Sequence, residues 1–305
     1  MFTMNGNEIA FDVENAQLGC GLNGAVYFVS MDEDGGMAKY SNNKAGAKYG
    51  TGYCDSQCAR DLKWIGGKGN VEGWSPSDMD ENTGIGDMGA CCAEMDLWEA
   101  NSMSFALTPH PCETNEYFIC ETTNCGGTYS EERYSGSCDP DGSYRHGNTD
   151  FYGKGKTVDT SRKFTVVTQF HGSGSTLERL SQYFIQDGNK IPVPESQYVS
   201  GGSEIDAAFC DAAKDAFGDS QKFQEMGGLP QMGDATGKGM VLVMSVWDDG
   251  YANMLWLDGE RYPLDRDPSE PGVARGECPT EGSEPATVRE SQRNAQVTYS
   301  NFKYG

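Results

Sequence analysis

The sequence predicts an all-β fold, either a sandwich or a jelly roll with a groove on one face. Apolar runs of strand length recur along the chain, 40 glycines punctuate it, and long polar loops join the runs. Only one segment has a convincing helical pattern. A chain of 305 residues is long enough for one large β domain. We find no repeat, linker or second domain, so residues 1–305 are expected to form a single domain.

Several segments alternate or run apolar in the way strands do. Phe164, Val166, Thr168 and Phe170 fall on one face of their segment. The segment that ends at Trp247 is apolar on both faces, which predicts a strand sandwiched between layers. The expected strands are residues 8–13, 25–31, 164–170, 240–247, 252–257 and 295–302.

One helix is expected, from Asp206 to Phe217. Ser203 with Asp206 three positions on resembles an N-terminal cap, alanines follow, and Gly218 ends the helix. Loops of unusual length in a compact domain are commonly functional or disordered. Two such loops are expected here, at residues 66–90 and 121–150.

The net charge of −23 argues against nucleic acid and anionic membranes as partners, and it is compatible with a neutral polymer. No apolar run approaches the length of a membrane span.

Eleven cysteines include Cys54 and Cys58 and the adjacent pair Cys91 and Cys92. Their spacing fits a zinc ribbon poorly, and the three histidines are scattered. Disulfides in an oxidising compartment are therefore favoured over zinc, which stays the alternative. Because eleven is odd, at least one thiol is left over within the chain.

A run of nine residues that begins at Glu94, EMDLWEANS, places three carboxylates and a tryptophan within six positions. Two acids, one protonated and one ionised, can hydrolyse a glycosidic bond, and Trp98 offers a flat surface for a sugar ring. On a strand, Glu94 and Asp96 share a face. Glu99, five residues from Glu94, would face away, so a paired-acid site requires a bulge near Leu97. From spacing alone, a solvated acidic strand is the alternative.

Several blocks of the sequence resemble glycoside hydrolase family seven, and the match runs from Glu8 to Gly305. The resemblance implies a concanavalin-like β-jelly roll that hydrolyses β-1,4-glucan with retention of configuration, with long loops roofing a substrate tunnel. The blocks are EMDLWEANS from Glu94, ALTPHPC from Ala106, CGLNGAVYFVSMD from Cys20, AGAKYGTGYCDSQC from Ala45, NVEGW from Asn70 and VMSVWDD from Val243.

The resemblance makes Glu94 the nucleophile, Asp96 its supporting carboxylate and Glu99 the general acid/base. An ionised Glu94 would raise the pKa of Glu99 and keep it protonated until the leaving oxygen needs the proton. His110 matches an active-site histidine, with a structural role as the alternative. No cofactor and no metal is expected.

Residues of the substrate path follow from the same resemblance. Trp247 resembles a product-side sugar platform and Trp256 a position near the same end, although packing in an apolar strand is the alternative for Trp256. Polar positions that match product subsites are Arg133, Asp141, Arg145, Asp248 and Arg275. Positions that match the cleft nearer the reaction centre are Asn23, Tyr27, Gln57, Asp61 and Lys63.

The loop from Cys125 to Cys138 resembles the tunnel roof of the family's cellobiohydrolases, with Tyr129 and Arg133 at matching positions. This implies a monomeric, reducing-end cellobiohydrolase that acts on cellulose chains and releases cellobiose processively. Gly250 stands where a tyrosine is common, which would leave that part of the roof more open. An endoglucanase of the same family and a non-catalytic glucan-binding lectin are the alternatives.

The resemblance also implies five disulfide pairs. Of the eleven cysteines, only Cys210 has no partner among these pairs, so it is expected to be a free, buried thiol. The implied pairs are Cys20 with Cys278, Cys54 with Cys92, Cys58 with Cys91, Cys112 with Cys138, and Cys120 with Cys125.

The N-terminus carries no signal peptide, and Met1 stands where the family pattern is already mid-domain. N-terminal strands are therefore expected to be missing, together with the signal peptide of a secreted, extracellular enzyme. Because missing strands expose sheet edges, we expect these 305 residues alone to fold poorly and to have little activity.

Overall fold

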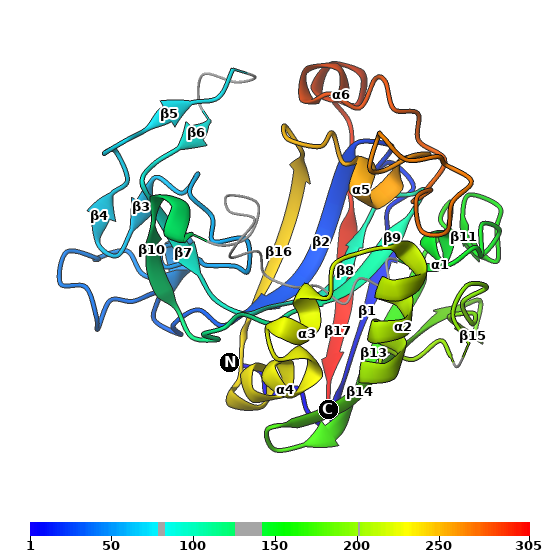
Figure 1. The fold of residues 1–305 in the computed structure, drawn as a ribbon, viewed down its shortest axis with the longest axis horizontal. Helices are drawn as coiled ribbons and strands as arrows, with labels where there is room; N and C mark the ends of the chain where they lie inside the picture. The colour runs from blue at the N-terminus through cyan, green and yellow to red at the C-terminus, as the bar shows by residue number, and fades with distance from the viewer. Residues whose placement is uncertain (79–82, 126–141, 201) are drawn as a thin grey trace.

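The computed structural model describes residues 1–78, 83–125, 142–200 and 202–305. Two antiparallel sheets form a sandwich, which confirms the all-β prediction (Figure 1). One sheet has the strand order β15-β14-β13-β1-β17 and the other has the order β16-β2-β8-β9. A lobe of short hairpins with β3 to β7 and β10 lies beside the second sheet (Figure 1).

The secondary structure has the following bounds. The strands of the five-stranded sheet are β1 (Glu8–Glu14), β13 (Phe164–Ser173), β14 (Thr176–Gln186), β15 (Asn189–Pro192) and β17 (Thr298–Tyr304). Those of the four-stranded sheet are β2 (Leu22–Val29), β8 (Glu94–Ala100), β9 (Phe105–His110) and β16 (Val241–Asp248). The short strands are β3 (Trp64–Ile65), β4 (Lys68–Gly69), β5 (Ser75–Pro76), β6 (Gly84–Ile85), β7 (Met88–Cys91), β10 (Phe118–Glu121), β11 (Tyr152–Gly153) and β12 (Val158–Asp159). The helices are η1 (Ala47–Tyr49), η2 (Thr122–Asn124), α1 (Gly142–Arg145), α2 (Ala207–Phe217), α3 (Lys222–Glu225), α4 (Gly228–Lys238), α5 (Leu255–Asp258) and α6 (Pro285–Ser291).

The main hydrophobic core lies between the two sheets and is rich in aromatic side chains. Trp98 is fully buried there, with Phe105 stacked on it at 5.4 Å between ring centroids. Phe164 and Phe184 of the opposite sheet meet the same indole at 5.9 Å each. The expected face of β13 is confirmed, because Phe164, Val166, Thr168 and Phe170 are all buried.

The helix expected at 206–217 is present as α2. Its N-cap is Asp206 itself, whose side chain accepts a hydrogen bond from the backbone N–H of Phe209 at 2.8 Å. Gly218 closes the helix in the left-handed conformation, as expected. None of the helices in the described ranges is both long and apolar enough to cross a bilayer.

The strand expected at 252–257 is wrong, because this segment turns and forms α5. The carboxylate of Asp249 accepts hydrogen bonds from the backbone N–H groups of Tyr251 and Ala252, at 2.7 and 3.0 Å. Asn253 and Met254 adopt positive φ, which no strand allows. A local Asx turn therefore overrides the apolar pattern.

The segment 240–247 does form a strand, β16, but it is not sandwiched between layers. It stands at the edge of its sheet, paired only with β2 in the described structure. Met244 and Val246 are each 53% exposed. The prediction of a strand buried on both faces is therefore wrong, because apolar residues on this strand are exposed.

Four disulfides join described residues, and they match four of the implied pairs: Cys20–Cys278, Cys54–Cys92, Cys58–Cys91 and Cys120–Cys125. The implied pairing of Cys112 is wrong, because Cys112 is a free, buried thiol that donates to the carbonyl oxygen of Cys92 at 3.2 Å. The expectation of a free Cys210 is also wrong, because Cys210 is disulfide-bonded. Cys138 lies outside the described residues.

Alkylation can test this assignment. Because Cys112 is buried and burial raises its pKa, we expect a maleimide to label it only after denaturation. Peptide mapping without reduction should find the label on Cys112 and none on Cys210. A label on Cys210 would contradict the structure.

Candidate active site

The acids of β8 share one face because the strand is irregular at the position where the sequence requires it. Across the ladder with β2, Val26 faces Trp98 and the next residue, Tyr27, faces Asp96, so Leu97 is an extra residue. The ladder with β9 shifts between Asp96 and Glu99 as well. This β-bulge confirms the predicted irregularity and turns Glu99 back to the face of Asp96.

The same bulge sends Leu97 and Trp98 together into the core. Both are fully buried in the cluster between the sheets. The expectation that Trp98 presents a surface to a sugar ring is therefore wrong.

Glu94 opens β8 and is 9% exposed. Its Oε2 accepts hydrogen bonds from Ser56, from the hydroxyl at 2.8 Å and from the backbone N–H at 3.2 Å. Burial raises the pKa of Glu94 to about 8, and the charge of Asp96 adds to the rise. His110 and the two hydrogen bonds from Ser56 act in the opposite direction, because they favour the ionised form and lower the pKa of Glu94.

Asp96 and His110 form the next pair. Asp96 is 3% exposed, and its Oδ2 lies 3.0 Å from Nε2 of His110. His110 stands directly across the ladder from Glu94. Possible metal-ligand atoms of Glu94, Asp96 and His110 all lie within 4.8 Å of one another, so these three residues could hold a cation. The two carboxylates already have partners without a cation, because Ser56 donates to Glu94 and His110 pairs with Asp96.

Glu99 is oriented by a buried amide. Nδ2 of Asn23 donates to Oε1 of Glu99 at 2.9 Å, and Oδ1 of Asn23 accepts from the backbone N–H of Ala100 at 3.1 Å. Asn23 is fully buried, so it reaches the site through Glu99.

Other expected cleft residues lie around this centre. Tyr27 is buried, its hydroxyl lies 2.9 Å from that of Tyr53, and burial and then Glu94 raise its pKa. Oε1 of Gln57 is buried without a hydrogen-bond partner among the described residues, so it could accept from a ligand. Asp61 and Lys63 are exposed.

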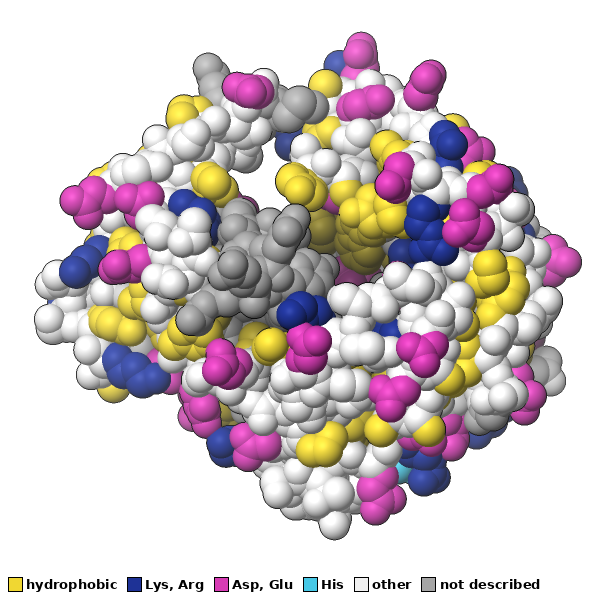
Figure 2. Space-filling model, in the orientation of Figure 1, with side chains coloured by type: hydrophobic (Ala, Val, Ile, Leu, Met, Phe, Trp, Pro, Cys, Tyr) yellow, Lys and Arg dark blue, Asp and Glu magenta, His cyan; other side chains and the backbone are white. Residues whose placement is uncertain are grey.

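The two expected aromatic residues lie together. Trp247 is 38% exposed and stacks on Trp256, with ring centroids 6.2 Å apart and planes 28° apart. Nε1 of Trp256 donates to Asp249 at 3.1 Å. Figure 2 shows a hollow between the lobe of β5 and β6 and the side that carries α5, with apolar side chains along the α5 side.

The expected product-site residues differ in their surroundings. Arg145 is 2% exposed and its guanidinium packs on Phe217 and pairs with Asp219, so it is held within the protein. Arg275 is also buried, near the ring of Tyr262. Asp248 pairs with Arg289 at 2.7 Å. Tyr129, Arg133 and Asp141, with the loop around them, lie outside the described residues.

Sequence reasoning missed Ser56 and its neighbour Asp55. A signal was present, because Cys91 and Cys92 stand just before Glu94, while Cys54 and Cys58 flank Ser56. Two disulfides between these pairs would place Ser56 beside the start of β8.

A β-sandwich that holds three acids on one face of a strand, two of them buried, with a histidine from the neighbouring strand beside them, has the composition of a glycoside hydrolase site. The comparisons with known proteins agree with this class. A profile described as Glycosyl hydrolase family 7 matches residues 1–305. The chain belongs to glycosyl hydrolase family 7.

Solved structures of this family are similar over the whole chain. A cellobiohydrolase from Melanocarpus albomyces, solved with cellotetraose, is 55% identical with a TM-score of 0.93, covering 100% of this chain and 71% of that one. A family 7 cellobiohydrolase from Daphnia pulex is 46% identical with a TM-score of 0.96, covering 100% and 71%. A Humicola insolens endocellulase is 35% identical with a TM-score of 0.80, covering 100% and 68%.

The burial of Glu94 has a measurable cost. Because burial and the charge of Asp96 raise the pKa of Glu94, its ionised form costs more free energy in the folded protein than in the unfolded chain, so stability falls as pH rises above the ordinary carboxyl pKa. At pH 7, the free energy of unfolding of Glu94→Gln should therefore exceed that of the parent by on the order of 2 kcal/mol, and its unfolding temperature should be higher. At pH 4 the two should be nearly equal. Calorimetry at both pH values measures this, and equal stability at pH 7 would contradict it.

Proposed function

We propose that this protein is a retaining cellobiohydrolase that cleaves β-1,4-glucosidic bonds of cellulose. The observation that carries the proposal is the bulge at Leu97, because it brings Glu94, Asp96 and Glu99 to one face of β8. A non-catalytic lectin would not need three acids aligned at the expense of a regular ladder.

In the proposed reaction, Glu94 attacks the anomeric carbon while Glu99 protonates the leaving oxygen. Ser56 holds one oxygen of Glu94 and leaves the other for attack. Once Glu94 is esterified its charge is gone, so Glu99 loses its proton more easily and activates water. Asp96 and His110 support the nucleophile, and Asn23 keeps Glu99 in place.

An exo mode of action is favoured over an endo mode by degree of likeness. The cellobiohydrolases are 46–55% identical with TM-scores of 0.93–0.96, whereas the endoglucanases reach 34–35% and 0.77–0.81. The roof loop with Tyr129 and Arg133 belongs to the same proposal. Trp247 is the proposed sugar platform, with Gln57, Asp61 and Lys63 along the chain path.

We also propose a secreted monomer that acts as one catalytic domain. Four disulfides among the described residues support an oxidising compartment. Cellulose chains are the proposed substrate and cellobiose the product.

Azide can separate the two acid roles. Glu94→Gly should lower kcat on an aryl β-cellobioside by more than about 1,000-fold, and azide should restore turnover by giving the α-cellobiosyl azide. Glu99→Ala with azide should instead give the β-azide, because its nucleophile is intact. NMR of the products distinguishes them, and exchanged anomers would reverse the assignments.

The exo proposal predicts soluble products. On filter paper, most new reducing ends should appear in solution as cellobiose, and Trp247→Ala should lower this yield several-fold while changing aryl cellobioside hydrolysis little. Leu264→Ala, at an exposed residue of a separate loop, is the matched control. A majority of new ends on the solid would favour the endoglucanase alternative.

A further inference from the structure

The loop from Cys54 to Cys58 is fastened at both ends to one short stretch of chain. Cys54 bonds Cys92 and Cys58 bonds Cys91, so two successive residues before Glu94 hold the two ends of the loop. The loop therefore moves with the start of β8.

Inside this loop, Ser56 is fully buried and both of its donors reach the same oxygen of Glu94. A double contact from one residue requires its backbone and its side chain to be oriented together. Whatever fixes the turn around Ser56 thus fixes the nucleophile.

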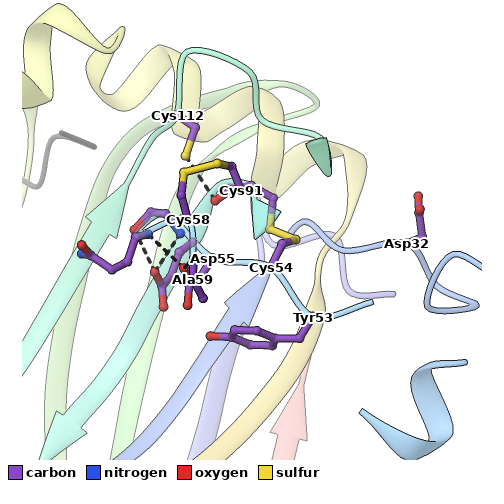
Figure 3. Close-up of a disulfide and its surroundings, with 12 residues drawn as sticks. Asp32, Tyr53, Cys54, Asp55, Cys58, Ala59, Cys91 and Cys112 are labelled. Carbon is purple, nitrogen blue, oxygen red and sulfur yellow. Dashed lines mark hydrogen bonds between the residues drawn. A yellow bond between two sulfur atoms is a disulfide. The ribbon is translucent and has the colours of Figure 1, made fainter. Parts of the chain in front are cut away.

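Asp55 is the residue that fixes this turn. Its Oδ1 accepts from the backbone N–H groups of Gln57 at 3.0 Å and Ala59 at 3.3 Å (Figure 3). Its backbone oxygen accepts from the N–H of Cys58 at 3.2 Å and of Cys92 at 3.0 Å. The side chain therefore reaches past Ser56 to the two N–H groups that follow it, as in an Asx turn.

The turn also holds an unfavourable backbone conformation. Cys58 has a φ of 57°, which L-residues adopt at a cost unless their surroundings fix it. Asp55 and the disulfide to Cys91 are the surroundings that do so. The two disulfides hold the ends of the loop, but by themselves they do not determine the direction in which Ser56 points.

We propose that Asp55 is a positioning residue for the reaction, acting through Ser56 on Glu94. The proposal rests on the function proposed above, in which Glu94 is the nucleophile. Burial and the neighbouring Glu94 raise the pKa of Asp55 to about 8, so at acidic pH an asparagine amide reproduces both its shape and its neutral charge.

A double-mutant cycle tests this with an aryl β-cellobioside at pH 5. Ser56→Ala should lower kcat about 10- to 100-fold, the effect of losing a hydrogen bond to a charged group, with little change in KM. Asp55→Ala should have a similar effect. Because both act through one contact, Asp55→Ala should add less than about 3-fold in the Ser56→Ala background.

The conservative variant supplies the second readout. Asp55→Asn should keep kcat within about 3-fold of the parent, because its amide oxygen still accepts from Gln57 and Ala59. Asp55→Ser, whose shorter hydroxyl supports the turn more weakly, should lie between asparagine and alanine, and it replaces alanine in the cycle if that variant does not fold. Asp267→Ala is the control, since Asp267 makes the same turn contact with Ser269 on the exposed surface.

The outcomes are distinct. Full activity of Asp55→Ala, or effects that multiply in the double variant, would overturn the positioning role. If Glu94→Gln were as active as the parent, the proposed function itself would fail, whatever Asp55 does.

Discussion

The one extra residue in β8 is the constraint on which the site depends. Regular alternation after Asp96 would turn Glu99 into the core and Trp98 toward the cleft. Truncation of a core tryptophan costs about 3–5 kcal/mol, whereas an irregular ladder forfeits a hydrogen bond worth about 1 kcal/mol. Because Leu97 and Trp98 are both fully buried, packing between the sheets maintains the bulge. The hydrophobic core thus sets the direction of the general acid.

Burying the acids of this face costs folding free energy. Glu94, Asp96 and Asp55 are three carboxyls buried near one another, and burial raises the pKa of Glu94 and of Asp55 to about 8. Such groups persist where donors and rigid supports compensate. Here the supports are Ser56, His110 and the paired disulfides, so the covalent links of the fold are concentrated beside its least favourable charges.

Local patterns predicted elements well where the local signal and the tertiary surroundings agree. The buried face of β13 and the capped helix α2 are examples. The segment 252–257 shows the opposite case, because the carboxylate of Asp249 captures backbone N–H groups that a strand would need. Apolar content on both faces of β16 likewise did not mean burial, since residues of an edge strand are exposed wherever no neighbour covers them.

The all-β class and the need for a bulge were predictable from the order of residues along the chain, and the three acids were identified by the resemblance of the blocks around them to a known family. The first two follow from the two-residue period of a strand, which is a property of neighbouring residues. The inward packing of Trp98, the free thiol of Cys112 and the contact of Ser56 with Glu94 became known from the three-dimensional structure. Each of those depends on contacts between segments far apart in the chain, and no local period encodes them.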